Sequence, residues 1–258
     1  MHYQVKKQIS QVVSIVDELF KEQIVGVYLY GSAILGGLYQ NSDLDILIIT
    51  DRKIINNERE IITKHFLNIS SPIGNIKKPL EITFVNRDDI VLKSFPPRYE
   101  YMYGEWLRDE IQRGKIPQSN CDPDLVILLW QARLHSMPLR GVDAKKIIPF
   151  ISNSEVRRAI LHSLPILVDN MKGDERNVLL TLARMWFTVE NQDICPKNIA
   201  AEWVVPKLPS NFAPLMKMAC QAYLGKCTDE WKYLEKQTAI IANFIKEKIE
   251  DSIVHIEK

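Results

Sequence analysis

Gly31 and Ser32, followed after ten residues by Asp43 and Asp45, are the residues of this sequence whose types and spacing suggest chemistry. The Gly-Ser pair follows the apolar run 24–30, and the acidic pair opens a second apolar run over 43–50. Glycine permits a sharp turn close to a ligand. Backbone N–H groups at such a turn, together with a serine hydroxyl, can bind phosphate oxygens. The spacing therefore predicts a phosphate-binding turn beside two carboxylates.

The two aspartates stand two positions apart on a predicted strand, so their carboxylates face the same side. Two anions about 7 Å apart repel each other unless a cation lies between them. Ligation by oxygen alone suits Mg²⁺, which usually takes one or two carboxylates together with substrate phosphates. Glu81, in the run 80–86, supplies a third acid, and beside metal-bound aspartates it is a candidate general base. The alternative is a set of solvated acids on strand ends.

The elements that must position these residues fall into two predicted domains. Runs rich in β-branched and aromatic residues predict strands over 24–30, 43–50 and 80–86. Apolar spacing predicts helices over 1–20, 57–68 and 98–113, so residues 1–120 form an α/β domain. Beyond residue 120 we expect no strand, and a helical bundle over 121–258. Its predicted helices span 123–137, 154–169, 174–190, 211–224 and 230–254.

Composition narrows the function classes. The 258 residues carry 33 Lys and Arg against 32 Asp and Glu, so the net charge of +1 argues against a nucleic-acid-binding surface. No run approaches the ~20 apolar residues that span a bilayer, and the first residues lack the pattern of a signal peptide. The four cysteines form no C-x-x-C pair, which disfavours zinc and a disulfide framework. We expect a cytoplasmic monomer that binds neither nucleic acid nor membrane.

The combination of G-S, ten residues, D-x-D and a later carboxylate resembles the nucleotidyltransferase superfamily related to DNA polymerase β. The longer string LYGSAILGGLYQNSDLDILI is similar to the aminoglycoside adenylyltransferases that modify streptomycin and spectinomycin. The resemblance continues through GEWLRDE (104–110), DPDLVILLWQARLHS (122–136), KGDERNVLLTLARMW (172–186), PKNIAAEW (196–203) and QAYLG (221–225).

This resemblance implies a role for particular residues. Asp43, Asp45 and Glu81 would bind two Mg²⁺ ions, with Glu81 also the catalytic base. Residues that would contact ATP are Gly31, Ser32, Ser42, Arg184 and Lys197. Residues that would contact the antibiotic are Trp106, Asp174 and Asn177.

The helical half supports part of this assignment independently of the resemblance. Asp174, Asn177, Thr181 and Arg184 follow one stripe of a helix whose Leu180, Ala183 and Phe187 can face the bundle. Simpler explanations exist for individual residues. Asp174 can be a helix N-cap, Arg184 and Lys197 can be solvated charges, and Trp106 can belong to the core.

One departure from the family pattern bears on the substrate. Relatives that also accept streptomycin resemble this chain but carry a Trp and an Asp shortly before the GDERN motif, where an ungapped comparison finds Pro165 and Asn170. The resemblance is therefore closest to the spectinomycin 9-adenylyltransferases. It implies Mg²⁺-dependent transfer of AMP from ATP to the 9-hydroxyl of spectinomycin, an aminocyclitol antibiotic. The alternatives are transfer to the 3''-hydroxyl of streptomycin as well, or to another acceptor such as RNA or protein.

Overall fold

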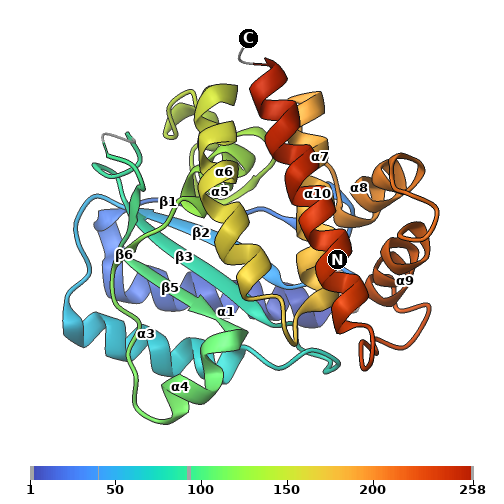
Figure 1. The fold of residues 1–258 in the computed structure, drawn as a ribbon. Helices are drawn as coiled ribbons and strands as arrows, with labels where there is room; N and C mark the ends of the chain where they lie inside the picture. The colour runs from blue at the N-terminus through green and yellow to red at the C-terminus, as the bar shows by residue number, and fades with distance from the viewer. Residues whose placement is uncertain (1–2, 40, 92–93, 257–258) are drawn as a thin grey trace. The chain divides into compact units, whose positions relative to one another are not determined.

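The computed structural model describes residues 3–39, 41–91 and 94–256. Residues 1–2, 40, 92–93 and 257–258 lie outside the described part, so the start of the helix predicted over 1–20 does too. The chain divides into two compact units, which Figure 1 shows in one view. Unit 1 comprises residues 1–38 and 42–151, and unit 2 comprises residues 39–41 and 152–258. Unit 1 therefore extends about thirty residues beyond the predicted boundary at 120/121.

Unit 1 is built on a mixed sheet with the strand order β5-β3-β2-β1-β7. The neighbours β2 and β3 run parallel, whereas the other neighbouring pairs are antiparallel. The three strands predicted over 24–30, 43–50 and 80–86 are confirmed within one residue at each end, as β1, β2 and β3. The strands are β1 (Ile24–Leu29), β2 (Leu44–Thr50), β3 (Leu80–Asn86), β5 (Tyr101–Gly104) and β7 (Met137–Gly141).

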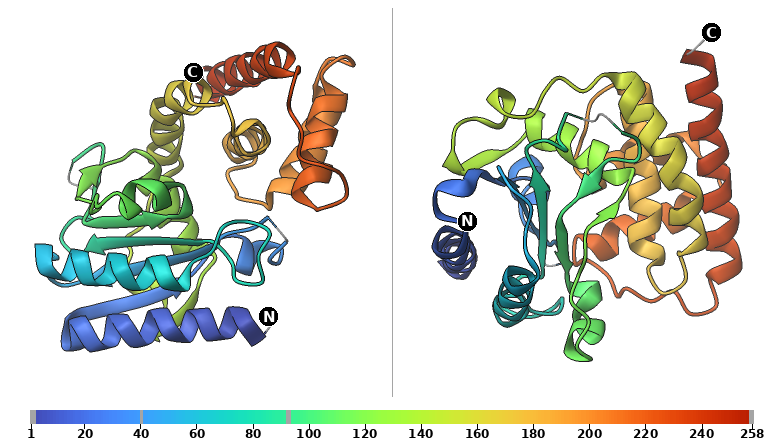
Figure 2. Two further views of the ribbon diagram at one scale, coloured as in Figure 1. Left: turned by 90° about the horizontal axis from the view of Figure 1, so that it is seen from below. Right: turned by 90° about the vertical axis from the view of Figure 1, so that its left-hand side faces the viewer.

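Two long helices, α1 (Tyr3–Phe20) and α3 (Asn56–Ile69), cover one face of this sheet. Figure 2 shows both helices on the same side of the strands. Every second strand residue points toward them, which gives a core that contains Ile46, Ile82 and Phe84. Residues on the opposite face, among them Leu47 and Val85, are also fully buried. Burial on both faces explains why the strands are nearly continuous apolar runs.

The helix predicted over 98–113 is wrong. The segment contains the short strand β4 (Arg98–Tyr99), strand β5, a 3-10 turn η2 (Glu105–Leu107) and the short helix α4 (Arg108–Gln112). Tyr101 and Tyr103 are buried on either side of the half-buried Met102 and pack against Phe66 of α3 at ring-centroid distances of 6.3 and 6.0 Å. This period of two is the signature of a strand, and pairing with β3 outweighs the helical spacing of the apolar residues.

The expectation of no strand beyond residue 120 is also wrong. Strand β6 (Asn120–Cys121) pairs with β4, and β7 pairs with β1. Helix α5 (Asp124–Leu134) ends before the predicted residue 137, and Pro138 lies in β7. A proline is tolerated there because β7 is the edge strand of the sheet.

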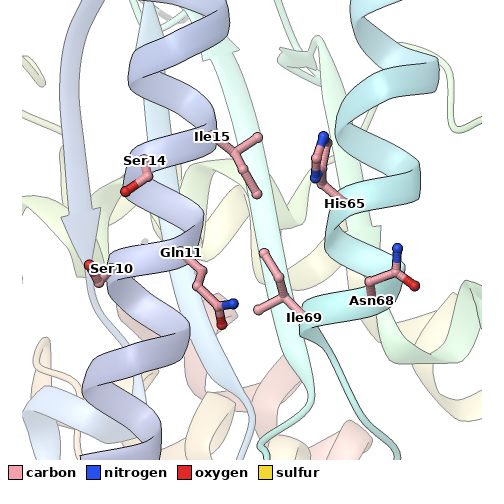
Figure 3. Close-up of a pocket in the computed structure, with 7 residues that line it drawn as sticks. All are labelled: Ser10, Gln11, Ser14, Ile15, His65, Asn68 and Ile69. Carbon is pink, nitrogen blue, oxygen red and sulfur yellow. The ribbon is translucent and has the colours of Figure 1, made fainter.

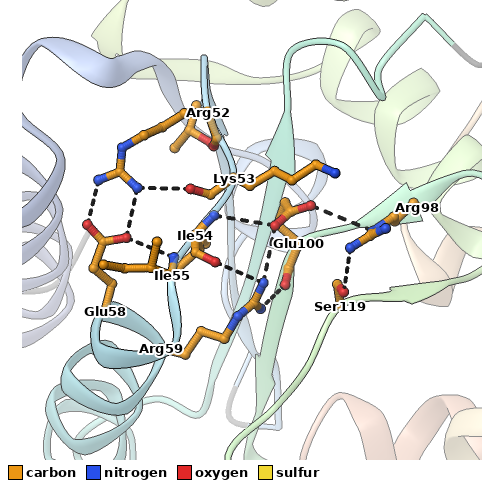
Figure 4. Close-up of polar contacts among 10 residues, drawn as sticks. Arg52, Lys53, Ile54, Ile55, Glu58, Arg59, Arg98, Glu100 and Ser119 are labelled. Carbon is orange, nitrogen blue, oxygen red and sulfur yellow. Dashed lines mark hydrogen bonds and ion pairs between the residues drawn. The ribbon is translucent and has the colours of Figure 1, made fainter.

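Arg59 and Glu100 form an almost completely buried ion pair in unit 1 (Figure 4). Their side chains are 6% and 1% exposed, and the charged atoms are 3.1 Å apart. Arg59 also donates to the carbonyl oxygens of Ile54 and Glu100, and the Ile54 N–H donates to the Glu100 carboxylate. The network joins α3 to the start of β5.

Unit 2 is a helical bundle, as predicted, with α7 in contact with each of the other four α-helices. Helix α8 was not among the predicted helices, although its residues belong to a motif of the family resemblance. Trp203 within it packs edge-on against Trp186 and Phe187. Residues 39–41 belong to this unit because the Tyr39 ring meets the Tyr223 ring, with centroids 5.4 Å apart. The helices are α6 (Asn153–Asp169), α7 (Glu175–Asn191), α8 (Lys197–Val204), α9 (Ala213–Tyr223) and α10 (Glu235–Ile256).

A pocket lies between α1 and α3 on the helix-covered side of unit 1 (Figure 3). None of the predicted site residues lines it, because Asp45 and Glu81 occupy the opposite face of the sheet. The pocket is lined by Ser10, Gln11, Ser14, Ile15, His65, Asn68 and Ile69.

In the described ranges no helix is long and apolar enough to cross a bilayer.

Candidate active site

Gly31 forms the turn between β1 and the short helix α2 (Ser32–Leu35). Its φ angle of 65° lies in the left-handed region that favours glycine. A Cβ atom at this position would overlap Oδ2 and Cγ of Asp45. Glycine is thus required twice, for the backbone conformation and for the close approach of the turn to a carboxylate.

Hydrogen bonds join the two halves of the motif across the ten residues that separate them. The Ser32 hydroxyl donates to the backbone carbonyl of Asp43 at 3.4 Å, and the Tyr30 N–H donates to that of Asp45 at 3.1 Å. Ser42 is buried, with 3% of its surface exposed. The structure therefore brings Gly31, Ser32 and Ser42 to the same end of β2 as the two aspartates.

Glu81 lies directly beside Asp45, because the two are partners in the parallel register of β2 and β3. The next strand places Gly104 of β5 opposite Glu81. Asp45 and Glu81 are half-buried, on the sheet face away from α1 and α3. Asp45, Glu81 and Gly104 therefore form a row of neighbours across three strands, at the amino-terminal ends of β2 and β3.

The ring of Trp106 lies over the backbone of Gly104, at the end of this row. A Cβ atom on Gly104 would overlap the ring atoms Cη2, Cζ2 and Cζ3 of Trp106. The tryptophan is 59% exposed, so it is not part of the core. An exposed indole beside the strand that carries Glu81 offers a flat apolar surface for a ligand.

The carboxylates fit Mg²⁺ by their chemistry, as hard oxygen donors. Among the described residues, however, no three Asp, Glu, His or Cys side chains are gathered in a way that could hold a metal ion. A Mg²⁺ ion bound by Asp43 and Asp45 would therefore need nucleotide oxygens to complete its coordination. This is the usual state of Mg²⁺ in enzymes that act on nucleotide phosphates.

In unit 2, the predicted residues Asp174, Asn177 and Lys197 form a connected chain. Asn177 Nδ2 donates to Asp174 Oδ2 at 3.1 Å, and Lys197 Nζ donates to Asn177 Oδ1. Asp174 occupies the N-cap position of α7, but its side chain makes no capping hydrogen bond. The capping alternative therefore does not account for its carboxylate, which is exposed.

Arg184 lies on the same side of α7 as Asn177 and is half-buried. Leu180 and Ala183 are buried, as the predicted stripe requires, whereas Phe187 is half-buried against Trp203. The predicted site residues are thus divided between the units. Unit 1 holds the motif residues and Trp106, and unit 2 holds the rest.

Sequence reasoning missed two groups near the site. Burial lowers the pKa of the Lys78 ammonium, while the Asp43 carboxylate acts in the opposite direction. This lysine lies two residues before β3, and no motif spacing indicated it. Glu105 and Arg108 form an ion pair beside Trp106. Both lie inside the segment GEWLRDE, which was predicted to be helical, so their position could not be derived.

Comparison with known proteins agrees with this geometry. Residues 14–95 match the family model described as polymerase beta nucleotidyltransferase. Residues 146–248 match that of the aminoglycoside adenylyltransferase C-terminal domain. The mixed sheet with its Gly-Ser turn and carboxylate row therefore defines a nucleotidyltransferase.

Full-length relatives narrow the class. A spectinomycin 9-adenylyltransferase of Campylobacter jejuni is 50% identical, with 95% of both chains covered. One from Staphylococcus aureus is 43% identical, with 96% of both covered. A crystal structure of a spectinomycin adenyltransferase from Enterococcus faecalis with ATP and spectinomycin matches with a TM-score of 0.90 and 33% identity, over 95% of this chain and 99% of that one. The chain belongs to the aminoglycoside adenylyltransferase family.

Proposed function

We propose that this protein transfers AMP from ATP to the 9-hydroxyl of spectinomycin and releases pyrophosphate, which confers resistance to the antibiotic. The observation that carries the proposal is the row formed by Asp45 and Glu81 beside the Gly31 turn, in a chain 50% identical to a spectinomycin 9-adenylyltransferase. The family supplies the class of acceptor, and the row supplies groups suited to phosphoryl chemistry.

The carboxylates of Asp43 and Asp45 would hold Mg²⁺ against the triphosphate, and two ions are expected from the resemblance. When bound, Mg²⁺ neutralises charge that develops on the α-phosphate and on the leaving pyrophosphate. Gly31, Ser32 and Ser42 would contact the triphosphate from unit 1. Arg184 and Lys197 would supply positive charge to the phosphates from unit 2.

Glu81 is the proposed base. It would accept the proton of the 9-hydroxyl as the hydroxyl oxygen attacks the α-phosphorus in line with the bond to the leaving oxygen. The carboxylate of Glu81 neighbours Asp45, so the acceptor oxygen and the metal-bound phosphate would meet at one place. Little covalent chemistry falls to the protein, and rate would come from positioning and charge stabilisation.

Spectinomycin carries two secondary amines, which are cationic when protonated. Asp174 would pair with one of them, with Asn177 fixing the carboxylate by its 3.1 Å hydrogen bond. Trp106 would pack against the ring system. The protein is expected to act as a cytoplasmic monomer on this small molecule without nucleic acid, and these points stay predictions.

Streptomycin is the less favoured acceptor. Relatives named aminoglycoside (3'') (9) adenylyltransferase, such as that of Escherichia coli, are 33% identical, against 50% and 43% for two named spectinomycin 9-adenylyltransferases. Pro165 lies within α6, and Asn170 at its end donates to the Ile166 carbonyl at 2.9 Å. Neither residue offers an aromatic ring or a carboxylate to a cationic drug.

The test is Mg²⁺-dependent release of pyrophosphate from ATP, with spectinomycin and streptomycin assayed in parallel. We expect release with spectinomycin and none above background with streptomycin. Release with both would contradict the specificity, and release with neither would contradict the proposed acceptor. Mass spectrometry of the product should show the mass of one added AMP.

A further inference from the structure

Glu105 lies at the centre of a polar network that the proposed roles do not use. Its Oε2 accepts hydrogen bonds from the Ser70 hydroxyl and, at 3.3 Å, from the Tyr103 hydroxyl. Arg108 binds both carboxylate oxygens, through Nε to Oε1 and through Nη2 to Oε2 at 3.2 Å. The Glu105 and Arg108 side chains are only 14% and 20% exposed. The carboxylate is therefore held in one orientation by three partners.

One side of the network reaches the start of β3. The Ser70 oxygen that donates to Glu105 accepts a buried hydrogen bond of 3.0 Å from the Leu80 N–H. Arg108 Nη2 also donates to the carbonyl oxygens of Leu67 and Ser70, at 3.1 and 3.2 Å. The end of α3 and the first residue of β3 are thus fixed to Glu105. Leu80 directly precedes the proposed base, Glu81.

The other side of the network is the backbone of Glu105 itself, between Gly104 and Trp106. Gly104 is the register partner of Glu81, and the Trp106 ring lies over it in the space a Cβ would fill. Since more than half of the Trp106 surface is exposed, the ring depends on the turn η2 for its position. Anchoring the Glu105 side chain anchors that turn.

We propose that Glu105 is a positioning residue that sets the base Glu81 and the substrate platform Trp106 relative to each other. The inference rests on the proposed function only for the roles of those two residues. A displacement of about 1 Å between reacting groups can cost about 10²-fold in rate. One carboxylate that holds both elements therefore affects turnover and drug binding together.

Replacement of Glu105 by Gln tests this role sharply, because the carboxylate faces only donors. Arg108 donates to both carboxylate oxygens and has no acceptor, so the amide NH₂ group meets one of its donors in either orientation. An amide NH₂ group would face donor hydrogens, so at least one hydrogen bond to the side chain of residue 105 would be lost. The matched control is E110Q, which removes an exposed ion pair with Lys115 close by.

Steady-state kinetics with spectinomycin should show a kcat of E105Q about 10- to 100-fold below wild type, a raised KM for spectinomycin and an unchanged KM for ATP. E110Q should match wild type in all three. S70A removes the hydroxyl that links the Glu105 carboxylate to the Leu80 N–H at the start of β3. It should lower kcat and leave the KM for spectinomycin unchanged. Wild-type kinetics in E105Q would overturn the proposal. A loss in E105Q that scales with a lower Tm would also overturn it, since that result means instability.

A second readout is independent of activity. Acrylamide quenching of Trp106, taken as the difference between each chain and its W106F version, should increase in E105Q and not in E110Q. Unchanged quenching in E105Q would overturn the proposal even if activity fell. Were wild-type enzyme inactive on spectinomycin, the proposed function would fail, whereas increased quenching would still support the positioning role.

Discussion

The Cα atoms of Asp45 and Glu81 are partners in the parallel register of β2 and β3, so two carboxylates stand side by side on adjacent strands. Adjacent strands are about 4.8 Å apart, a distance at which two anions repel each other. The backbone of the tight turn at Gly31 lies against the Asp45 carboxylate. Two neighbouring carboxylates do not stabilise the fold, because they repel each other. The arrangement suits a site where a divalent cation and a triphosphate bind.

Asp45→Asn is expected to lower kcat by at least ~10³-fold, because about 4 kcal/mol of charge stabilisation through the metal is lost. The fold should be unaffected, since the side chain is half-buried and amide and carboxylate have the same shape. Pyrophosphate release across a Mg²⁺ titration checks the first point and thermal unfolding the second. Asp88→Asn, an exposed acid beyond β3, is the control. Near-normal turnover of Asp45→Asn would show that the metal assignment is wrong.

Glu81→Gln should lower kcat by about 10²–10⁴-fold, because the amide cannot accept the proton of the attacking hydroxyl. Single-turnover measurements with saturating ATP separate the chemical step from product release. An unchanged single-turnover rate would assign the base to another group.

In unit 1, the strands that could be predicted are those whose own residues form an apolar run rich in β-branched side chains, namely β1, β2 and β3. The run 80–86 matches β3 to the residue, and its alternation correctly places Glu81 on the face opposite Leu80, Ile82 and Phe84. Which strands are neighbours, by contrast, depends on tertiary contacts. The partnership of Asp45, Glu81 and Gly104 in one row could not be derived from local spacing.

The segment 98–113 shows the limit most clearly. Its apolar residues suit a helix, yet Tyr101 and Tyr103 bury their rings against α3 and β3, and this packing decides in favour of a strand. The prediction of Trp106 as a binding residue came from the family resemblance alone. Its physical reason, a ring over a glycine that faces the base, required the strand β5.

Trp106→Ala should raise the KM for spectinomycin about fivefold, the loss of roughly 1 kcal/mol expected for an exposed aromatic contact to a cation. With 59% of its surface exposed, Trp106 contributes little to the core, so the Tm should hardly change. Isothermal titration with spectinomycin in the presence of a non-hydrolysable ATP analogue measures the binding directly. Unchanged affinity would remove Trp106 from the drug site.

Arg59→Met is expected to destabilise unit 1 by about 3 kcal/mol, because the Glu100 carboxylate loses its buried cation and keeps only the more exposed Arg98, at 3.6 Å. Glu100 is 1% exposed, so solvent cannot compensate. Urea unfolding measures the change. The exposed pair of Glu110 and Lys115 provides the comparison, and its removal should cost less than about 1 kcal/mol. A double variant, Arg59→Met with Glu100→Leu, should recover part of the loss, whereas no recovery would point to packing as the cause.

Asp89→Asn should stabilise the protein at neutral pH. Burial, and then the Glu100 carboxylate, raises the pKa of Asp89 above its usual 3.8. The folded protein therefore binds this proton more tightly than the unfolded chain, and its stability falls as pH rises through the folded-state pKa. The neutral amide escapes this penalty, so the Tm difference between variant and wild type should be positive at pH 7. It should shrink toward zero as the pH approaches 3.8 from above. Thermal unfolding of both proteins over this range checks the sign, and a constant Tm difference at all pH values would contradict the electrostatic cause.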